Sequence, residues 1–408
     1  MVSGDRPYLL LGLVSFAGIL ALSSFALWPV FLIQLGTSWG LSNSDIGWIG
    51  GAYFFGYLVA TPILVGLTDR LDARLIFIGG CGFTALGCVL FASMARDFWS
   101  AALAWALVGC GLAGTYMPGL QILNARLADA VRVRAVPWYT ACFGIGTGGS
   151  FALMGLMLAM ADYQVAAYIA ATAAGGAAVI VAVTVRPYQR PQTPPVARHP
   201  LDLRPAFRKP VAMGYIIAYG AHSFELFAYR TWCFALLVFL AGRSEVDTGV
   251  GAITTIVTLI TVSGMFASLI GARLCLQFGR HRVIALVGVA TAVASLITAL
   301  SLVVALWVTV VALWLYNICI MLDSGSLTTG TVEAGDEHDR GALLAVHSMV
   351  GFGGGALGGP VIGYVLDHNG GSTSMDAWFY ALLAMGAGSW LVFFVQRYFW
   401  QPAAGQVR

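Results

Sequence analysis

The sequence carries little charge. Only 10% of its 408 residues are Asp, Glu, Lys or Arg, whereas 59% are hydrophobic. A soluble globular chain has about 25% charged residues, because polar side chains must cover its surface. The mean hydropathy of +0.84 points the same way. We therefore expect most of the chain to face lipid rather than water.

Lysine is almost absent, and this limits the chemistry. Lys209 is the only lysine, and its surroundings do not form the Gly-rich phosphate loop of ATPases. His222 and Glu225 have a metal-ligand spacing, but the second His of a zinc-protease helix is missing. We expect neither an enzyme nor a bound cofactor or metal. No paired spacing for a zinc or redox site occurs among the cysteines, which we expect to be packing residues: Cys81, Cys88, Cys110, Cys142, Cys233, Cys275 and Cys319.

Long apolar runs dominate the chain. A bilayer core of about 30 Å requires about 20 apolar residues per helix. These runs stay apolar over whole helix lengths, which favours helices over strands of alternating polarity. We predict an all-α membrane protein with spans near residues 9–33, 46–66, 75–96, 98–122, 137–160, 163–185, 210–240, 249–271, 282–303, 305–332, 342–364 and 375–396.

The longest polar stretch divides these spans into two sets of six. Residues 186–209 are rich in proline and arginine and read as a linker. We therefore predict an N-terminal six-helix bundle at 1–185, a cytoplasmic linker at 186–209 and a C-terminal six-helix bundle at 210–408.

The basic residues predict the orientation, because Lys and Arg are retained on the cytoplasmic side of a membrane. With the N-terminus inside, only Arg96 and Arg243 fall in outer connections, and Arg230 falls within a span. We therefore expect a multi-pass protein of the bacterial inner membrane with both termini cytoplasmic. The net charge of +3 then reflects this asymmetry and not binding to nucleic acid.

A charged side chain at the bilayer centre costs about 2.5–3.5 kcal/mol on insertion scales, so ionisable residues within spans are functional candidates. Glu225 lies near the midpoint of the span at 210–240, with His222 and Tyr229 on the same helix face. Glu225 is our first candidate for a proton-coupling residue. Alternatively, it neutralises Arg230 or His222 and holds the helix in register.

Two further ionisable residues lie in these spans. Asp323, in the span at 305–332, is a second proton-coupling candidate together with His222, or else pairs with the cluster around Glu225. Arg230 could bind an anionic substrate through its planar donor fork. Alternatively, it is a structural partner of Glu225 or Asp323, or it extends toward the interface.

The remaining candidates for substrate binding are polar or aromatic residues within spans. Such groups need partners inside the protein, so helix contacts, packing and interface anchoring are the alternatives to substrate contact. The set comprises Tyr229, Trp232, Tyr53, Tyr116, Gln121, Asn124, Asn317 and His347.

Two motifs carry a resemblance to a known family. Residues 66–75, GLTDRLDARL, resemble the cytoplasmic loop signature of the major facilitator superfamily, and residues 272–282 resemble a degenerate copy. The run Gly355, Gly359, Pro360 and Gly363 resembles the helix-bending glycine motif of the same family. The resemblance implies a gating role for the loop residues and for a basic residue at the end of the fourth span: Gly66, Asp69, Arg70, Arg74 and Arg126, with Arg126 expected near Asp69.

The resemblance implies a fold of two pseudo-symmetric six-helix bundles that give alternating access to a central site. The spans at 210–240 and 342–364 are also similar to a bacterial branch described as nitrate/nitrite-porter-like, although the central arginines of nitrate carriers are missing. We expect a monomeric, proton-coupled secondary transporter of a small polar or anionic organic solute. An uncoupled facilitator and a non-transporting membrane receptor are the alternatives.

Overall fold

The computed structural model describes residues 6–68, 70–188, 203–244, 248–336 and 339–399, and nearly all of this backbone is helical. Eleven segments of the described part are long and apolar enough to cross a membrane, which confirms the all-α membrane fold. The helices are α1 (Pro7–Ala21), α2 (Leu27–Trp39), α3 (Asn43–Leu67), α4 (Ala73–Met94), α5 (Phe98–Arg126), α6 (Asp129–Met160), α7 (Tyr163–Thr184), α8 (Arg204–Phe207), α9 (Pro210–Ala241), α10 (Val250–Phe278), α11 (Arg280–Ser301), α12 (Leu306–Leu322), α13 (Ser324–Glu333), α14 (Arg340–His368) and α15 (Met375–Phe399).

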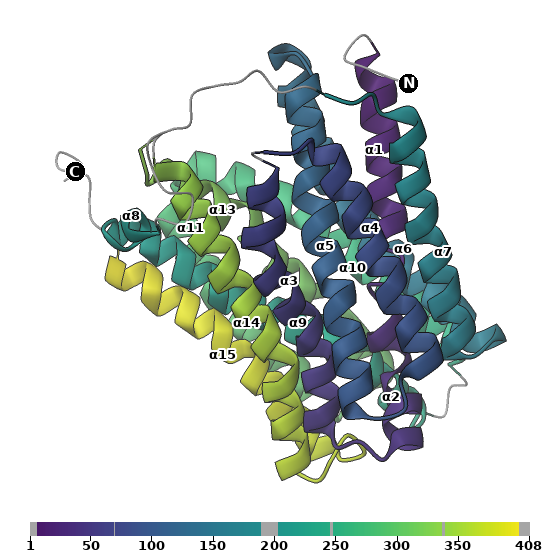
Figure 1. Cartoon of the computed structure of the whole chain (residues 1–408). Coiled ribbons are helices and arrows are strands. Elements are labelled where there is room, and N and C mark those ends of the chain that lie inside the picture. Colours follow the sequence, from purple (N-terminus) through teal and green to yellow (C-terminus); the bar gives the residue numbers. More distant parts are fainter. Residues whose placement is uncertain (1–5, 69, 189–202, 245–247, 337–338, 400–408) are drawn as a thin grey trace, which may run out of the picture. The chain divides into compact units, whose positions relative to one another are not determined.

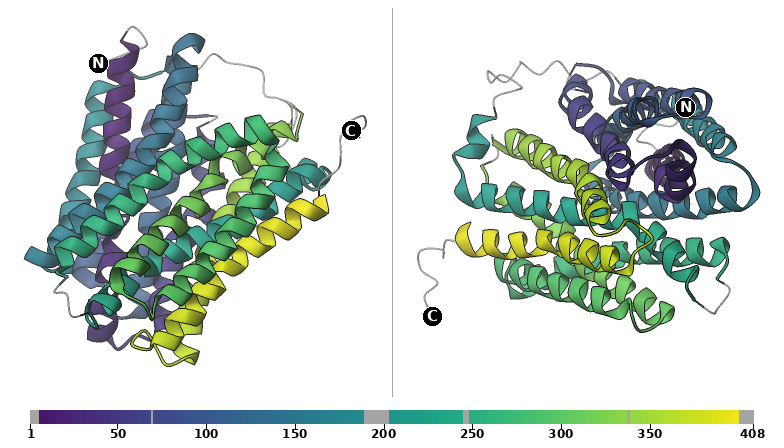
Figure 2. Two further views of the ribbon diagram at one scale, coloured as in Figure 1. Left: turned by 180° about the vertical axis from the view of Figure 1, so that it is seen from behind. Right: turned by 90° about the horizontal axis from the view of Figure 1, so that it is seen from below.

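The chain forms two compact units. The first comprises residues 1–196 and 248–262, and the second comprises residues 197–247 and 263–408. Within the first unit, α4 packs along α5 and α7, and α3 packs along α5 (Figure 1). Within the second unit, α9 packs against α14 and α15, and α15 also packs against α11 (Figure 2).

The expected linker at 186–209 contains the short helix α8, and its residues 189–202 lie outside the described part of the chain. The first change of unit along the sequence falls after Val196, inside that stretch. The twofold division into six-helix bundles stays a prediction.

The expected first span at 9–33 is interrupted, because two helices and not one continuous helix form over this stretch. The chain forms α1 and α2, with turns over residues 22–26 between them. The Ser150 hydroxyl of α6 donates to the Ser23 carbonyl at 2.6 Å and accepts from the Ala26 amide at 2.9 Å. A side chain from another helix thus satisfies backbone groups that the broken helix leaves unpaired, as an interruption at membrane depth requires.

Glycines on α14 permit its close contact with α9. A Cβ atom added at Gly354 would lie 2.1 Å from the Gly220 carbonyl oxygen, and one at Gly358 would lie 2.4 Å from the Phe224 carbonyl oxygen. At Gly355 an added Cβ would meet the Phe227 ring at 2.6 Å. Only glycine allows two helix backbones to approach this closely. The helix remains continuous through Pro360.

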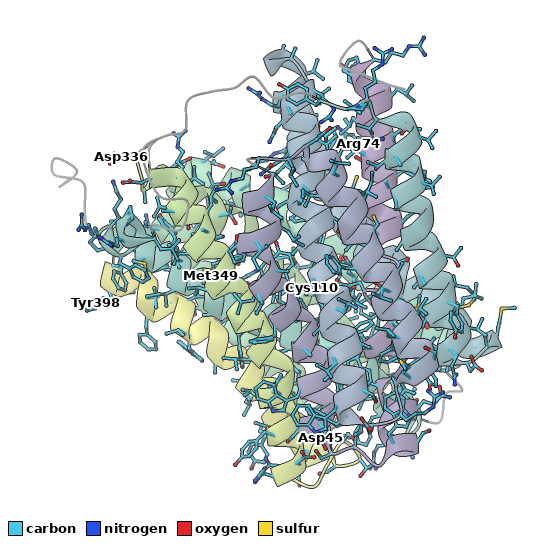
Figure 3. All side chains as sticks on the ribbon, in the orientation of Figure 1. Asp45, Arg74, Cys110, Asp336, Met349 and Tyr398 are labelled. Atoms are coloured by element: carbon cyan, nitrogen blue, oxygen red, sulfur yellow. The ribbon has the colours of Figure 1, made fainter. Side chains whose placement is uncertain are left out.

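Figure 3 labels one residue near each end of the first unit, the acidic Asp45 and the basic Arg74. Asp45 lies in the first turn of α3, where its carboxylate and the Ser42 hydroxyl cap the helix reciprocally. Arg74 lies at the opposite end of the bundle, at the beginning of α4. The loop between α3 and α4 therefore belongs to the end that holds the basic residue.

We expect Gly354→Ala to destabilise the protein, because its new methyl group would collide with the α9 backbone. Overpacking of this kind costs about 1–3 kcal/mol. The adjacent Gly353→Ala is the matched control, since nothing lies within 4 Å of its added Cβ. Thermal unfolding in detergent should show a lower Tm for Gly354→Ala and an unchanged or slightly higher Tm for Gly353→Ala. Equal melting of the two variants would contradict the close contact.

Candidate functional site

The candidate site is a network of buried polar side chains in the second unit, centred on Glu225 of α9. Glu225 is only 1% exposed. The Tyr316 hydroxyl of α12 donates to Oε1 at 2.6 Å. The Ser389 hydroxyl of α15 donates to Oε2. Three helices that are distant in sequence therefore meet at one carboxyl group.

The His222 imidazole, one helical turn before Glu225, contacts the Asp323 carboxyl group. Its Nδ1 lies 2.8 Å from Asp323 Oδ1, and both side chains are almost fully buried. Asp323 stands at the junction where α12 ends and α13 begins, so the expected span at 305–332 is interrupted at this residue. Of the roles considered for Asp323, pairing with the cluster on α9 is the one that the geometry supports directly.

Tyr219 and His347 extend the network toward α14. The Tyr219 ring stacks on the His347 ring at 3.9 Å and faces the His222 ring at 5.9 Å, with small interplanar angles. Both ring nitrogens of His347 lie 3.0 Å from threonine hydroxyls of α13, Nε2 from Thr328 and Nδ1 from Thr331. Thr331 donates its own hydrogen to the Leu327 carbonyl, so it accepts from Nδ1. His347 thus ties α13 to α14.

The other candidates on α9 are also buried. The Arg230 residue is 6% exposed, and its guanidinium carbon lies 5.9 Å from the centre of the Phe227 ring. The Tyr229 hydroxyl donates to the Leu313 carbonyl at 2.9 Å. The Trp232 indole donates to the Gly359 carbonyl at 3.0 Å. Tyr229 and Trp232 therefore each join α9 to a neighbouring helix.

The remaining sequence candidates lie in other surroundings. Tyr53 is buried among aromatic rings that include Phe25 and Trp105. Tyr116 lines a small, largely apolar pocket within the first unit. Asn317 of α12 is buried. The side chains of Gln121 and Asn124 on α5 are half-buried.

Sequence reasoning missed Tyr316, Ser389, Tyr219 and the two threonines of α13. Serine, threonine and tyrosine are ordinary constituents of membrane helices, so their presence in an apolar run carries no signal of its own. What makes Tyr316 and Ser389 special is the carboxylate that they reach, and they are 91 and 164 residues away from it along the chain.

A second polar cluster lies at the end of the first unit that holds the α3–α4 loop. Arg126 Nη2 donates to both carboxylate oxygens of Asp72 at 2.9 Å and to the Arg186 carbonyl at 3.0 Å. The Tyr188 amide donates to Asp72 Oδ2 at 2.8 Å, and the Tyr188 ring lies under the Arg126 guanidinium. Asp72 and Arg126 together hold the chain that follows α7.

The expected loop motif is only partly described. Asp69 lies outside the described residues, so its expected contact with Arg126 stays a prediction. Gly66 and Arg70 are exposed. Arg74 donates to the Val181 and Ala182 carbonyls at the end of α7.

The environment of Asp72 changes its proton affinity. Partial burial alone would raise the pKa of Asp72, but the hydrogen bonds from Arg126 and from the Tyr188 and Arg74 amides outweigh it and hold the pKa below its usual value. Asp72 is therefore charged at neutral pH and forms an ion pair with Arg126.

Comparison with known proteins identifies the family. The model of the Major Facilitator Superfamily matches residues 13–358, which is most of the chain. The chain belongs to the Major Facilitator Superfamily. No curated protein sequence matches this superfamily member. The superfamily membership and the fold of this chain agree with a transporter rather than an enzyme.

Solved structures share the fold over nearly the whole chain. A bacterial homologue of the human lysosomal transporter Spinster, inward-facing and unoccupied, is 14% identical with a TM-score of 0.79, covering 98% of this chain and 100% of that one. The nucleoside transporter NupG is 16% identical with a TM-score of 0.77, covering 97% and 100%. The fucose:proton symporter FucP of E. coli is 17% identical with a TM-score of 0.61, covering 98% and 100%. At these identities the likeness shows the fold alone.

We expect Asp72→Asn to lower the stability of this superfamily member at neutral pH by about 1–2 kcal/mol, because it removes charged hydrogen bonds. The folded pKa of Asp72 is below its ordinary value near pH 4, so its stabilisation is complete above about pH 4 and is lost as the pH falls through the folded pKa. Thermal unfolding in detergent at several pH values measures this.

The control for this prediction is Arg126→Lys, which keeps the charge but cannot reach the carboxylate and the Arg186 carbonyl together. We expect it to melt between the wild type and Asp72→Asn. Identical melting of Asp72→Asn and wild type at pH 7 would show that the pair contributes nothing.

Proposed function

We propose that this protein is a proton-coupled secondary transporter of a small polar or anionic organic solute, and that Glu225 carries the coupling proton. The observation that supports this most is the position of Glu225. It lies in the middle of α9, is almost completely buried, and has two hydroxyl groups as its hydrogen-bond partners among the described residues.

The surroundings of Glu225 affect the free energy of both of its protonation states. A charge within a span costs several kcal/mol, and hydroxyl groups offset this less completely than a cation does. The carboxyl group can therefore exist in both protonation states without destroying the fold, as a coupling residue requires. By contrast, His222 and Asp323 already neutralise each other when His222 is protonated. We assign this pair a supporting role in the same network.

The family likeness supports the class of substrate. Nucleosides and fucose, named for two of the solved relatives, are small polar solutes, and fucose is moved with a proton. The buried cation Arg230 lies on the same helix as Glu225, and it favours a solute that carries negative charge. The basic residues further support the bacterial inner membrane with both termini cytoplasmic, and we propose a monomer.

Glu225→Gln is expected to abolish uptake driven by a pH gradient while leaving solute counterflow intact, because the neutral amide mimics the protonated state. Purified protein in lipid vesicles on a solid-supported membrane would be screened with carboxylates, inorganic anions, sugars, nucleosides and organic cations at two pH values. The matched control is Glu333→Gln, which removes an acid at the end of α13 that is paired with Arg280.

Each outcome of this screen decides between functions. Loss of coupling only in Glu225→Gln supports the proposal. A pH-independent flux in the wild type would indicate an uncoupled facilitator. Binding seen as thermal stabilisation, without any flux, would indicate a receptor.

Arg230→Gln is expected to weaken the binding of anionic solutes at least tenfold, since a charged hydrogen bond contributes about 1.5–3 kcal/mol. Neutral solutes should bind as before. Ligand-induced thermal stabilisation measures both. The matched control is Arg243→Gln, because Arg243 also lies over a phenyl ring, that of Phe239, but stands beyond the end of α9. Unchanged binding of every anion would remove Arg230 from the substrate site.

A further inference from the structure

Two hydroxyl groups from two different helices hold the same buried carboxyl group. Tyr316 is 0% exposed and Ser389 is 4% exposed, so water does not replace either of them. Each hydroxyl reaches a different oxygen of Glu225. This arrangement donates one hydrogen bond to each oxygen, which stabilises the charged form of a carboxyl group more than the neutral form.

The contact with Ser389 depends on a close approach of α15 to α9. A Cβ atom added at Gly388 would lie 2.7 Å from the Ala221 carbonyl oxygen and 3.2 Å from Glu225 Oε2. Because Gly388 has no side chain, α15 and α9 can lie this close together. Ser389, the next residue, can then reach the carboxyl group.

Tyr229 of α9 supports the contact between Tyr316 and Glu225. The Tyr229 ring packs edge-on against the Tyr316 ring at 5.4 Å, and the Tyr229 hydroxyl binds the Leu313 carbonyl one turn earlier on α12. α9 and α12 are thus joined next to the Tyr316–Glu225 hydrogen bond. A movement of α9 along α12 would strain that bond directly.

Other titratable groups belong to the same buried network. His222 lies on α9 itself, Asp323 at the α12–α13 junction and Cys319 on α12. α15 contributes the Ser389 hydroxyl, which does not titrate, and the His347 ring of α14 stacks on the Tyr219 ring. His222 and Asp323 are occupied with each other. The two hydroxyls are therefore the groups whose hydrogen bonds end on Glu225 in the described part of the chain.

We propose that Tyr316 and Ser389 are positioning residues that set the proton affinity of Glu225, so that a change in the packing of α9 against α12 or α15 becomes the uptake or release of a proton. This inference rests on the proposed function, in which Glu225 carries the coupling proton. It adds the two hydroxyl groups through which a movement of the helices would change the proton affinity of Glu225.

The proton balance of this step is simple. When Glu225 releases its proton to water, its O–H bond breaks and both hydroxyls donate to the resulting carboxylate. When Glu225 takes up a proton, one carboxyl oxygen becomes a donor to Ser389. Ser389 then turns its own hydrogen to a carbonyl of the preceding turn of α15, as serine commonly does in membrane helices.

The test needs no substrate. Infrared spectroscopy of the purified full chain in lipid vesicles follows the carbonyl stretch of protonated carboxyl groups while the pH is varied, and Glu225→Gln identifies the band of Glu225 by its loss. We expect Tyr316→Phe and Ser389→Ala each to raise the pH at which this band is half lost by about one pH unit. This shift corresponds to the loss of one hydrogen bond to a charged group.

Gly388→Ala tests the packing itself. It keeps both hydroxyl groups in the chain but moves α15, and with it Ser389, away from α9, so we expect an upward shift of the titration midpoint, as for Ser389→Ala. The controls are Tyr139→Phe and Ser301→Ala, which remove buried hydroxyls that bind backbone carbonyls instead. Neither control should move the titration.

The outcomes separate the inference from the proposed function. If Glu225→Gln removes the band and the pH-driven flux, but the midpoint is unchanged in both Tyr316→Phe and Ser389→Ala, the inference is overturned and the proposed function stands. If Glu225→Gln leaves the pH-driven flux intact, the proposed function fails. Tyr316→Phe keeps the aromatic ring and removes only the hydroxyl group. If Tyr316→Phe does not fold, the titration midpoint of Ser389→Ala decides whether the inference holds.

Discussion

A polar group within a membrane-spanning helix must find its partner inside the protein, because lipid offers none. This constraint explains several side-chain hydrogen bonds that join the helices of the structure. The Ser150 hydroxyl satisfies the backbone where the first span is broken. The hydroxyl of Tyr229 and the indole of Trp232 bind carbonyls of neighbouring helices. Glu225 is the case on which our proposal rests, since its hydrogen-bond partners in the described part of the chain are two hydroxyl groups and not a cation.

Close helix packing and polar contacts depend on each other here. Gly354 lets α14 approach α9, and Gly388 lets α15 approach α9 near Glu225. At both places an alanine would collide with a backbone carbonyl. The many glycines of this chain are therefore more than flexible points in a helix. They bring helices close enough for short side chains such as Ser389 to reach a carboxyl group on another helix.

The two units place their paired polar side chains at different positions along their helices. In the first unit, Arg126 and Asp72 lie at the end of α5 and beside the beginning of α4, where they hold the chain that follows α7. In the second unit, His222 pairs with Asp323 near the middle of α9, one turn from Glu225, and α9 is the most deeply buried of the candidate spans. Charge at a helix end fixes a connection, whereas charge at membrane depth is costly. This difference is why we locate coupling in the second unit.

The sequence by itself determined the membrane class and the approximate spans, and it singled out Glu225, His222 and Asp323 as ionisable residues within those spans. These features are local, because a span is a run of apolar residues and a charge within it is unusual wherever it packs. Only the tertiary structure decided the break between α1 and α2, the pairing of Arg126 with Asp72, and the hydrogen bonds from Tyr316 and Ser389 to Glu225. Those contacts join residues far apart in the chain, and which helix faces meet is set by packing that no single helix encodes.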